Sequence, residues 1–325
     1  MTVRDVVTFI RLTSALRDVR SVAITRASAG KRFGLHSIRI AAPLNGVEVT
    51  GRGAAFSEME AYLRAWGEFV ERATFHNVVA RGIVEPPTTS SGFASHTSWE
   101  RASLAAVAEL VERDAFCCSW LLAQPATLIA RASLERHLRA RGVRRIIDDE
   151  GACLRYGVLG RCMGFVAGIV CIELREKFAI ATAARPSLDS VLEQLTLEAV
   201  FVASGWLANE YPSAIETLPE SVEPIDHQRY YLERGPRSDL AKALIVEGDE
   251  ARELPEFEFQ VRELTALAPL ARCAGYEVAY ASTRDAQRLW FGATGPEVVN
   301  LDRLSKVAGR RVSFGELRHA PHPLP

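Results

Sequence analysis

The spacing of hydrophobic residues along the chain predicts three long helices. In each of them apolar residues recur at intervals of three and four, which places them on one helix face. Each also opens like a capping box, in which a Ser or Thr precedes a Glu by three residues. The helices are expected at residues 57–80, 97–122 and 190–210, beginning at SEME, TSWE and SVLE.

Alternating or continuous apolar runs predict the strands. Residues 37–50 alternate and contain Asn45-Gly46, which is typical of a two-strand hairpin. Further strands are expected at 152–160, 164–174, 177–184 and 276–283. Gly, Pro and Ser mark connections at 51–56 and 82–95. Shorter helices are expected at 133–141 and 261–275.

Together these elements predict one α+β domain over residues 1–325, with mixed or antiparallel sheets and long helices. No stretch has a composition that would divide the chain, and the most informative motifs fall within 36–210. Residues 211–255 are polar and contain several prolines, so we expect a flexible or partner-facing excursion there. Residues 319–325 form a proline-rich tail.

The composition is that of an ordinary globular protein, with 48% hydrophobic and 24% charged residues. A formal net charge of -1 provides no whole-chain basic field of the kind that binds nucleic acid. No apolar run reaches the roughly 20 residues of a membrane span, and the start of the chain does not resemble a signal peptide. We therefore expect a soluble, cytoplasmic protein without nucleic-acid or membrane partners.

The cysteines are expected to be buried free thiols in a reducing cytoplasm. None of them forms a Cys-X-X-Cys pair, which disfavours a zinc knuckle. They are Cys117, Cys118, Cys153, Cys162, Cys171 and Cys273.

Two of the long helices carry the same charged pattern, Glu-X-X-Glu-Arg, among apolar residues. It supplies Glu68, Glu71 and Arg72 in the first helix, and Glu109, Glu112 and Arg113 in the second. Residues three apart share a helix face, and paired carboxylates in an apolar frame need a nearby cation. Carboxylates suit Mg²⁺ and arginines suit phosphate, so the pattern indicates a magnesium–nucleotide site between long helices. The P-loop sequence is absent.

The same residues also fit a simpler interpretation, in which each pattern is a solvated stripe with ion-pair support along the helix. A further acid, Glu198, stands in the apolar run QLTLEAVFVASGW, one turn after Gln194. It is either the edge of an amphipathic stripe or a functional carboxylate.

Taken together, these segments resemble the YcaO-domain family. SSGFASHTSWERASLAAVAELVERDAF is similar to the family signature, a Ser-X-Gly loop followed by a helix reading Glu-hydrophobic-hydrophobic-Glu-Arg-Asp-Ala. SEMEAYLRAWGEFVER resembles an earlier family helix that ends Gly-Glu-X-X-Glu-Arg, and LTLEAVFVAS occupies the place of a later Ala-Leu-X-Glu-Ala helix. The order and spacing of these motifs extend over residues 37–325.

The resemblance implies that the long helices hold ATP and Mg²⁺. The acids with which the family holds Mg²⁺ and phosphates match Glu68, Glu71, Glu109 and Glu112. The arginines of the two family motifs match Arg72 and Arg113. Gln194 and Glu198 are candidate nucleotide contacts on the third helix. Thr97 stands where the family often has a polar nucleotide contact, although a plain helix N-cap explains it equally well.

The last five residues, Pro321 to Pro325, fit Pro-X-Pro-X-Pro. Composition alone predicts a disordered tail. In the azoline-forming subfamily, such a tail resembles a C-terminus that threads back toward the active site, and proline lowers the entropy cost of ordering it. We therefore assign Pro321, Pro323 and Pro325 as candidate catalytic residues, with the terminal carboxylate of Pro325 as a candidate base.

The implied reaction is ATP-dependent cyclodehydration of a ribosomally synthesised precursor peptide to a thiazoline or oxazoline. A Cys, Ser or Thr side chain adds to the preceding carbonyl, and the amide oxygen takes the γ-phosphoryl group of ATP. The resemblance also implies an E1/ThiF-like partner protein that binds the leader of the precursor. A flavin-dependent azoline dehydrogenase could share the complex, with this chain as a dimer within a hetero-oligomer.

Four positions depart from the common family pattern. Arg52 replaces Lys in Gly-Lys-Gly, and Arg101 stands where an acid is frequent in some relatives. Phe201 and Ala203 follow Glu198 where Gln or Arg is common. These departures leave open a non-catalytic nucleotide-binding scaffold. A thioamide- or amidine-forming enzyme is the other alternative, which the Pro-X-Pro-X-Pro ending disfavours.

Overall fold

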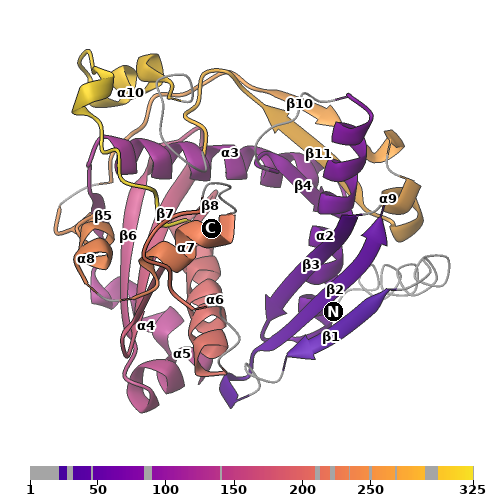
Figure 1. The fold of residues 1–325 in the computed structure, drawn as a ribbon, viewed down its shortest axis with the longest axis horizontal. Coiled ribbons are helices and arrows are strands. Elements are labelled where there is room, and N and C mark those ends of the chain that lie inside the picture. Colours follow the sequence, from indigo (N-terminus) through magenta and orange to yellow (C-terminus); the bar gives the residue numbers. More distant parts are fainter. Residues whose placement is uncertain are drawn as a thin grey trace. The chain divides into compact units, whose positions relative to one another are not determined.

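The computed structural model divides the chain into two compact units, whose elements Figure 1 shows. The first unit comprises Met1–Leu110 and Phe259–Ser282, and the second comprises Val111–Glu258 and Thr283–Pro325. The described residues are 22–27, 32–44, 47–83, 90–139, 141–208, 213–219, 224–233, 235–248, 251–267, 269–289 and 299–324. Helices and antiparallel or mixed sheets confirm the predicted α+β class.

The first unit is built on an antiparallel sheet in the order β1-β2-β3. The strands are β1 (Ala23–Ala27), β2 (His36–Leu44) and β3 (Val47–Ala55). The predicted hairpin is confirmed, because β2 and β3 pair in antiparallel register from Leu44 and Val47 onward. Its turn residues, Asn45 and Gly46, lie outside the described residues.

Strand β3 continues through Gly51, Arg52 and Gly53, which were predicted to form a connection. That assignment is wrong because the glycines serve helix packing. A Cβ atom at Gly51 would lie 2.2 Å from the carbonyl oxygen of Ala65, and one at Gly53 would lie 2.0 Å from that of Ala61. The absence of a side chain at both positions therefore lets helix α2 approach the strand closely.

Helix α2 (Glu58–Ala80) confirms the first predicted helix, with Ser57 at its N-cap. The predicted capping box does not form. The Ser57 side chain makes no cap hydrogen bond, and Glu60 instead pairs with Arg64 at 2.7 Å. The pair is one turn apart along the exposed helix surface, where such contacts are favourable.

The other two long helices are confirmed with shifted starts. Helix α3 spans Trp99–Leu121, so Thr97 stands two residues before its first residue. Helix α6 spans Leu188–Leu207, and its N-cap is Ser187, whose hydroxyl accepts the N–H of Ser190 at 3.2 Å. Ser190, the predicted start, therefore lies within the first turn. No helix in the described ranges is both long enough and apolar enough to span a membrane.

A second antiparallel sheet of the first unit has the order β10-β11-β4. Its strands are β4 (Phe93–His96), β10 (Gln260–Glu263) and β11 (Glu277–Ser282). The strand predicted at 276–283 is confirmed as β11. The connection predicted at 82–95 ends in β4 because Phe93–His96 pair with β11, while residues 84–89 lie outside the described residues.

The helix predicted at 261–275 is wrong over its first half. Strand β10 occupies the start, a 3₁₀ turn η3 (Thr265–Leu267) follows, and only α9 (Pro269–Ala274) is helical. The pairing of β10 with β11 is a long-range contact that local periodicity does not report.

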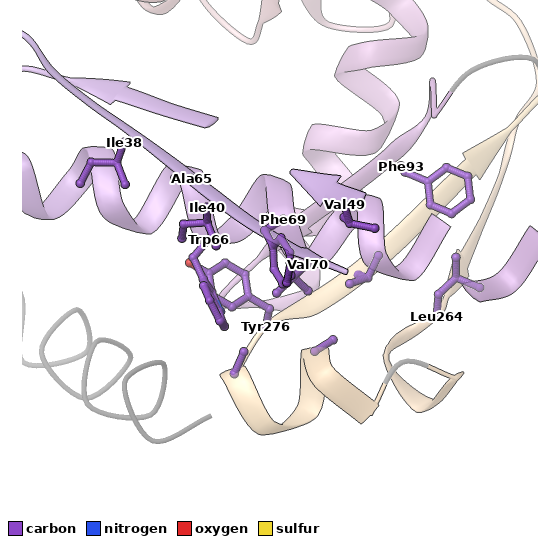
Figure 2. Packing of buried hydrophobic residues seen from close by; sticks show 14 of the residues in the cluster. Ile38, Ile40, Val49, Ala65, Trp66, Phe69, Val70, Phe93, Leu264 and Tyr276 are labelled. Carbon is purple, nitrogen blue, oxygen red and sulfur yellow. The ribbon is translucent and has the colours of Figure 1, made fainter. Parts of the chain in front are cut away.

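Figure 2 shows the core of the first unit, which forms where α2 packs against the strands. Trp66 and Phe69 from α2 are fully buried, with ring centroids 5.4 Å apart, and Ile40 from β2 is also fully buried. The Tyr276 hydroxyl donates to the carbonyl oxygen of Leu63 on α2 at 2.9 Å. These contacts fix the position of α2, which carries the first Glu-X-X-Glu-Arg pattern.

The second unit contains a five-stranded sheet in the order β8-β7-β6-β5-β9. The strands are β5 (Ala126–Leu128), β6 (Cys153–Cys162), β7 (Phe165–Leu174), β8 (Lys177–Arg185) and β9 (Ile245–Val246). All neighbours are antiparallel except β5 and β9. The three strands predicted within 152–184 are confirmed, and α6 packs against β7 and β8 (Figure 1).

Shorter helices complete the second unit, and the helix predicted at 133–141 is confirmed by α4. They are α4 (Arg131–Leu138), α5 (Arg141–Arg144), the π-helical turn η2 (Arg145–Asp149), α7 (Pro224–Tyr231), α8 (Pro236–Lys242), α10 (Leu301–Ala308) and the 3₁₀ turn η4 (Phe314–Glu316).

The irregular excursion predicted at 211–255 is wrong for much of its length. It contributes α7 and α8, which pack near β8, and β9, which extends the sheet. Tyr231 and His227 on α7 are almost fully buried. The prolines that suggested irregular structure open these helices at Pro224 and Pro236, where proline is well tolerated.

The prediction of buried free thiols is confirmed for four cysteines, Cys117, Cys118, Cys162 and Cys171. It is wrong for Cys153, which is free but exposed at the start of β6. Burial raises the pKa of Cys162 to about 11 and that of Cys171 to about 12, so both remain thiols near neutral pH. The side chain of Cys273 lies outside the described residues.

Candidate functional site

Three of the predicted acids come together within the first unit. Glu68 and Glu71 lie on α2, and Glu109 lies on α3. The pKa of Glu71 is raised well above its usual range, chiefly by burial and then by the charges of Glu109 and Glu68. The neighbouring Arg72 acts in the opposite direction but does not cancel these effects. Burial and the two neighbouring carboxylates therefore disfavour the charged form of Glu71.

Each acid of this cluster accepts a backbone N–H from a strand or from the turn before it. The N–H of Arg52 on β3 donates to Glu68 Oε2 at 2.8 Å, and Ser95 on β4 supplies a backbone hydrogen bond to Glu71. Gly92, just before β4, donates its N–H to Glu109 Oε2 at 3.3 Å. Two sheets thus hold the carboxylates of two helices in place through main-chain contacts.

The close packing of α2 on β3 explains the contact to Glu68. Gly51 and Gly53 let the helix approach, and the N–H of the residue between them reaches the carboxylate. Since this donor is a main-chain group, the replacement of the family's usual Lys by Arg52 does not alter it. Arg72 adds an ion pair with Glu68 at 2.5 Å, although the Arg72 side chain is 44% exposed.

The Ser-X-Gly loop positions the other two acids. Gly92 has a φ of +86°, a conformation that favours glycine, and a Cβ atom there would lie 2.3 Å from the carbonyl oxygen of Ala281. The Ser95 hydroxyl donates to the carbonyl oxygen of Gly67 at 2.6 Å, which holds β4 close to α2. Gly92 and Ser95 were not predicted as contacts of the acids. For Gly92, the Ser-X-Gly loop of the family signature was the available signal.

Glu112 belongs to the second unit, because the boundary falls after Leu110 within α3. Its Oε1 accepts a hydrogen bond from the Thr182 hydroxyl on β8 at 2.7 Å and lies 3.7 Å from Arg113 Nη1. The Glu112 side chain is 14% exposed. That all four acids serve one metal ion stays a prediction, since each unit is described by itself.

The remaining candidates have local partners. On α6, Gln194 Nε2 donates to Glu198 Oε1 at 2.8 Å, and both residues are partly buried. Ahead of α3, the Thr97 hydroxyl lies 3.3 Å from His96 Nδ1. These contacts fix the side chains but do not test their predicted roles toward a nucleotide.

The chemistry of the first-unit cluster fits a divalent cation. Carboxylate oxygens are the protein ligands that Mg²⁺ prefers, and a bound cation would relieve the repulsion that raises the pKa of Glu71. Among the described residues, no group of three or more His, Cys, Asp or Glu side chains is placed to hold a metal ion. The fit to a divalent cation therefore rests on the ligand chemistry of the carboxylates, and their convergence on one ion stays a prediction.

The proline-rich tail is ordered and buried in the second unit, which contradicts the disordered alternative for residues 320–324. His322 is 0% exposed and Leu324 is 2% exposed. The indole N–H of Trp120, on α3, donates to the carbonyl oxygen of Ala320 at 2.9 Å. Pro321 is partly exposed and Pro323 is buried, while Pro325 lies outside the described residues.

The fold and the acid cluster describe an α+β protein with a carboxylate-rich site suited to a divalent cation. A family model for YcaO cyclodehydratases, described as ATP- and Mg²⁺-binding, matches residues 84–289. Because the match covers more than half of the chain, the protein belongs to the YcaO cyclodehydratase family, an ATP- and Mg²⁺-binding family of enzymes. A comparison with curated protein sequences finds no match.

The fold is similar to several solved structures. One is a heterocyclase in complex with substrate and cofactor, with a TM-score of 0.68 and 13% identity over 99% of this chain. This chain spans 57% of the length of that heterocyclase chain.

Two further structures match over most of their own length. YcaO from Methanopyrus kandleri, bound with AMPPCP and Mg²⁺, has a TM-score of 0.60 and 16% identity, covering 87% of this chain and 91% of that one. A chain of the E. coli microcin synthetase McbBCD complex with pro-MccB17 bound has a TM-score of 0.60 and 12% identity, covering 93% and 96%. At these identities the likeness shows the fold.

Proposed function

We propose that this chain catalyses the ATP-dependent cyclodehydration of Cys, Ser or Thr in a ribosomally synthesised precursor peptide, giving a thiazoline or oxazoline. The observation that carries the proposal is the cluster of Glu68, Glu71 and Glu109, in which main-chain donors hold the acids and the charges of Glu68 and Glu109 raise the pKa of Glu71. Membership of an ATP- and Mg²⁺-binding family indicates which ligands the cluster would bind.

In this proposal Glu68, Glu71, Glu109 and Glu112 hold Mg²⁺, which when bound stabilises the negative charge on the transferred phosphoryl group. Arg72 and Arg113 are placed beside these acids in sequence and serve the phosphates. Thr97, Gln194 and Glu198 are candidate contacts of the nucleotide. The chain itself orients the reactants and supplies fixed charges, and we expect no covalent enzyme intermediate.

The proposed reaction has two stages, addition with phosphoryl transfer and then elimination of phosphate. The thiol or hydroxyl loses its proton and bonds to the preceding carbonyl carbon, whose oxygen takes the γ-phosphoryl group and releases ADP. The nitrogen then forms a double bond to that carbon, loses its proton, and phosphate departs with the former amide oxygen. The peptide loses one water per ring, and ATP is converted to ADP and phosphate.

The position of the tail supports a role for it near the second-unit acid. Ala320 contacts Trp120 and His322 contacts Phe116, so the tail runs antiparallel to α3. An extended chain rises about 3.3 Å per residue and a helix about 1.5 Å, so two tail residues match one helical turn. We therefore propose that the tail approaches the level of Glu112 by Leu324. The assignment of Pro325 as the base remains a prediction.

We further propose that the chain works in a cytoplasmic hetero-oligomer, itself as a dimer. An E1/ThiF-like protein would bind the leader of the precursor peptide, and a flavin-dependent dehydrogenase could oxidise the azoline products. The similarity to a chain of a microcin synthetase complex with its precursor bound supports a multi-subunit assembly of this kind.

Reconstitution tests the proposed function. The chain is combined with the products of neighbouring genes and a Cys- and Ser-rich precursor peptide, and the peptide mass and phosphate release are measured. Loss of one water per ring, with matching phosphate release, is the expected result. Bound ATP with an unchanged peptide mass would indicate a scaffold, and replacement of oxygen by sulfur would indicate thioamide formation; either would contradict the proposal.

Thr182 provides a second test on the same assay. Because its hydroxyl holds Glu112 Oε1 at 2.7 Å, Thr182→Val is expected to lower kcat by roughly 10-fold, the lower end for loss of an outer partner of a metal ligand. Thr182→Ser keeps the hydroxyl and should retain most of the activity. Equal losses in both variants would assign Thr182 a packing role.

A further inference from the structure

Residues 318–324, which follow η4, lie along α3 and α7 within the second unit (Figure 1, yellow). The N–H of Arg318 donates to the carbonyl oxygen of Leu121, at the end of α3, at 2.8 Å. Beyond this point the segment becomes buried, and His322 is 0% exposed. A segment that is buried this deeply needs partners for its main-chain polar groups.

Three side chains donate hydrogen bonds to three consecutive carbonyl groups of the segment. Trp120 Nε1 donates to the oxygen of Ala320 at 2.9 Å, and the Tyr231 hydroxyl donates to the oxygen of Pro321. His227 Nδ1 donates to the oxygen of His322 at 2.7 Å. All three donors are almost fully buried. We call this surface, formed by Trp120, His227 and Tyr231, the carbonyl groove.

The state of His227 agrees with its role as a donor. A carbonyl oxygen only accepts, so Nδ1 must carry the proton. Burial lowers the pKa of His227, which leaves the ring neutral near pH 7. The groove therefore contributes neutral donors, and it holds the segment without placing an additional charge beside the tail.

The prolines of the segment complement these donors. Pro321 and Pro323 have no backbone N–H, so at these positions the buried chain presents a carbonyl acceptor without a donor that needs a partner. An ordinary residue at either position would bring an additional N–H into a surface whose polar groups facing the tail are themselves donors. The alternation of proline thus suits an extended peptide that is bound through its carbonyl oxygens.

Aromatic rings form the walls of the groove. The ring centroids of His227 and His322 are 4.2 Å apart, and Phe116 meets His322 edge-on at 6.2 Å. Trp120 and Tyr231 meet edge-on at 5.9 Å, which fixes the two donors relative to each other. The buried side chain of His322 therefore provides a specific anchor in addition to the carbonyl contacts.

We propose that the carbonyl groove is a binding site for an extended Pro-X-Pro peptide, occupied here by residues 320–324, and that Trp120, His227 and Tyr231 are positioning residues for the tail. The groove recognises the ligand by three adjacent carbonyl oxygens and one buried imidazole. That the bound tail is needed for cyclisation rests on the proposed function. That the groove binds the tail does not.

Hydrogen exchange in the full-length chain tests the groove without an activity assay. Trp120→Phe and Tyr231→Phe keep a ring and remove the donor. Each is expected to speed exchange of the Ala320, His322 and Leu324 amides by roughly tenfold, because a buried carbonyl loses its partner. Tyr276→Phe removes a comparable hydroxyl-to-carbonyl bond from the first unit and serves as the control. Wild-type exchange in both groove variants would overturn the proposal.

A peptide in trans provides the second measurement. A chain lacking residues 319–325 is titrated with a synthetic peptide of residues 318–325, and with one that carries Pro321→Ala and Pro323→Ala. Saturable binding of the first peptide, roughly tenfold tighter than the second, is expected. Should the shortened chain fail to fold, the exchange measurement decides alone. If neither peptide binds a folded shortened chain, the groove is not a peptide site.

Cyclisation separates this inference from the proposed function. If the groove variants expose the tail and lose ring formation while still binding ATP, the groove and the catalytic role proposed for the tail are both supported. If they expose the tail and ring formation continues at the wild-type rate, the groove stands and the catalytic role proposed for the tail fails.

Discussion

Replacing Glu71 by glutamine is expected to lower Mg²⁺-dependent ATP turnover by at least about 100-fold while the fold is retained. Glu71 is the acid on which the repulsion of the cluster is most evident, since burial and the charges of Glu109 and Glu68 all raise its pKa. Glutamine keeps the shape of the side chain and removes the charge that a cation would bind. The measurement is phosphate release at saturating ATP and Mg²⁺.

The same substitution should not destabilise the protein in the absence of Mg²⁺. The folded state raises the pKa of Glu71, so it holds this proton more tightly than the unfolded chain does. The free energy of unfolding therefore falls as the pH rises from the unfolded pKa through the folded one, and Glu71→Gln removes this fall. Denaturant unfolding at several pH values is expected to show an equal or higher midpoint for the variant above the unfolded pKa.

Glu60→Gln provides the matched control on the same helix. Glu60 is exposed and pairs with Arg64, away from the cluster, so both turnover and stability should change little. Normal turnover in Glu71→Gln would remove Glu71 from the metal site. Normal turnover in Glu71→Gln, Glu109→Gln and Glu112→Gln alike would refute the predicted site as a whole.

The long helices could be predicted because burial on one face imposes a period that a single sequence displays. α2, α3 and α6 all lie where the apolar spacing indicates. The starts were less accurate, since a Ser or Thr followed by a Glu predicts a cap but does not determine which hydroxyl forms it. At α6, Ser187 accepts the N–H of Ser190, the residue that the pattern favoured.

The strand through Gly51 and Gly53 could not be predicted from local sequence, because glycine is as typical of loops as of close packing. The reason for these glycines lies in the helix backbone that crosses them. β10 was not predicted for a related reason. It is a strand because it pairs with β11, which follows later in the chain. Contacts between distant segments determine both elements.

The acids of the site could be predicted, whereas the groups that hold them could not. A Glu-X-X-Glu spacing places two carboxylates on one face of a helix, and the spacing can be read directly from the sequence. The donors to Glu68 and Glu109 are the main-chain N–H groups of Arg52 and Gly92, and almost any residue type supplies such a group. Only the fold shows which ones are aimed at an acid.

Loss of Arg303 is expected to have the largest effect on stability. Its guanidinium is paired with Asp114 on α3, with Nε 3.0 Å from Oδ1 and Nη2 2.5 Å from Oδ2. The Arg303 side chain is 1% exposed and that of Asp114 is 0% exposed. Asp114 also accepts the N–H of Gln287 at 2.7 Å, so the pair connects α3 with α10 and with the segment before it.

Arg303→Met should therefore cost about 3–5 kcal/mol of the free energy of unfolding, because it leaves a buried carboxylate without its cation. Removing both charges with Arg303→Met and Asp114→Asn is expected to recover part of this loss, since asparagine needs no counter-charge and its oxygen can still accept from Gln287. Urea unfolding of the two variants and of the single Asp114→Asn variant measures the coupling.

The exposed Glu60 and Arg64 pair again supplies the comparison, because its removal should cost less than about 1 kcal/mol. The contrast depends on burial, since an exposed group that loses its partner is solvated by water and Asp114 is not. If Arg303→Met costs no more than Glu60→Gln, Asp114 must obtain compensation elsewhere, and the pair does not fix α10 to α3. A double variant less stable than Arg303→Met would show that the Asp114 charge is stabilised by its remaining partners without the arginine.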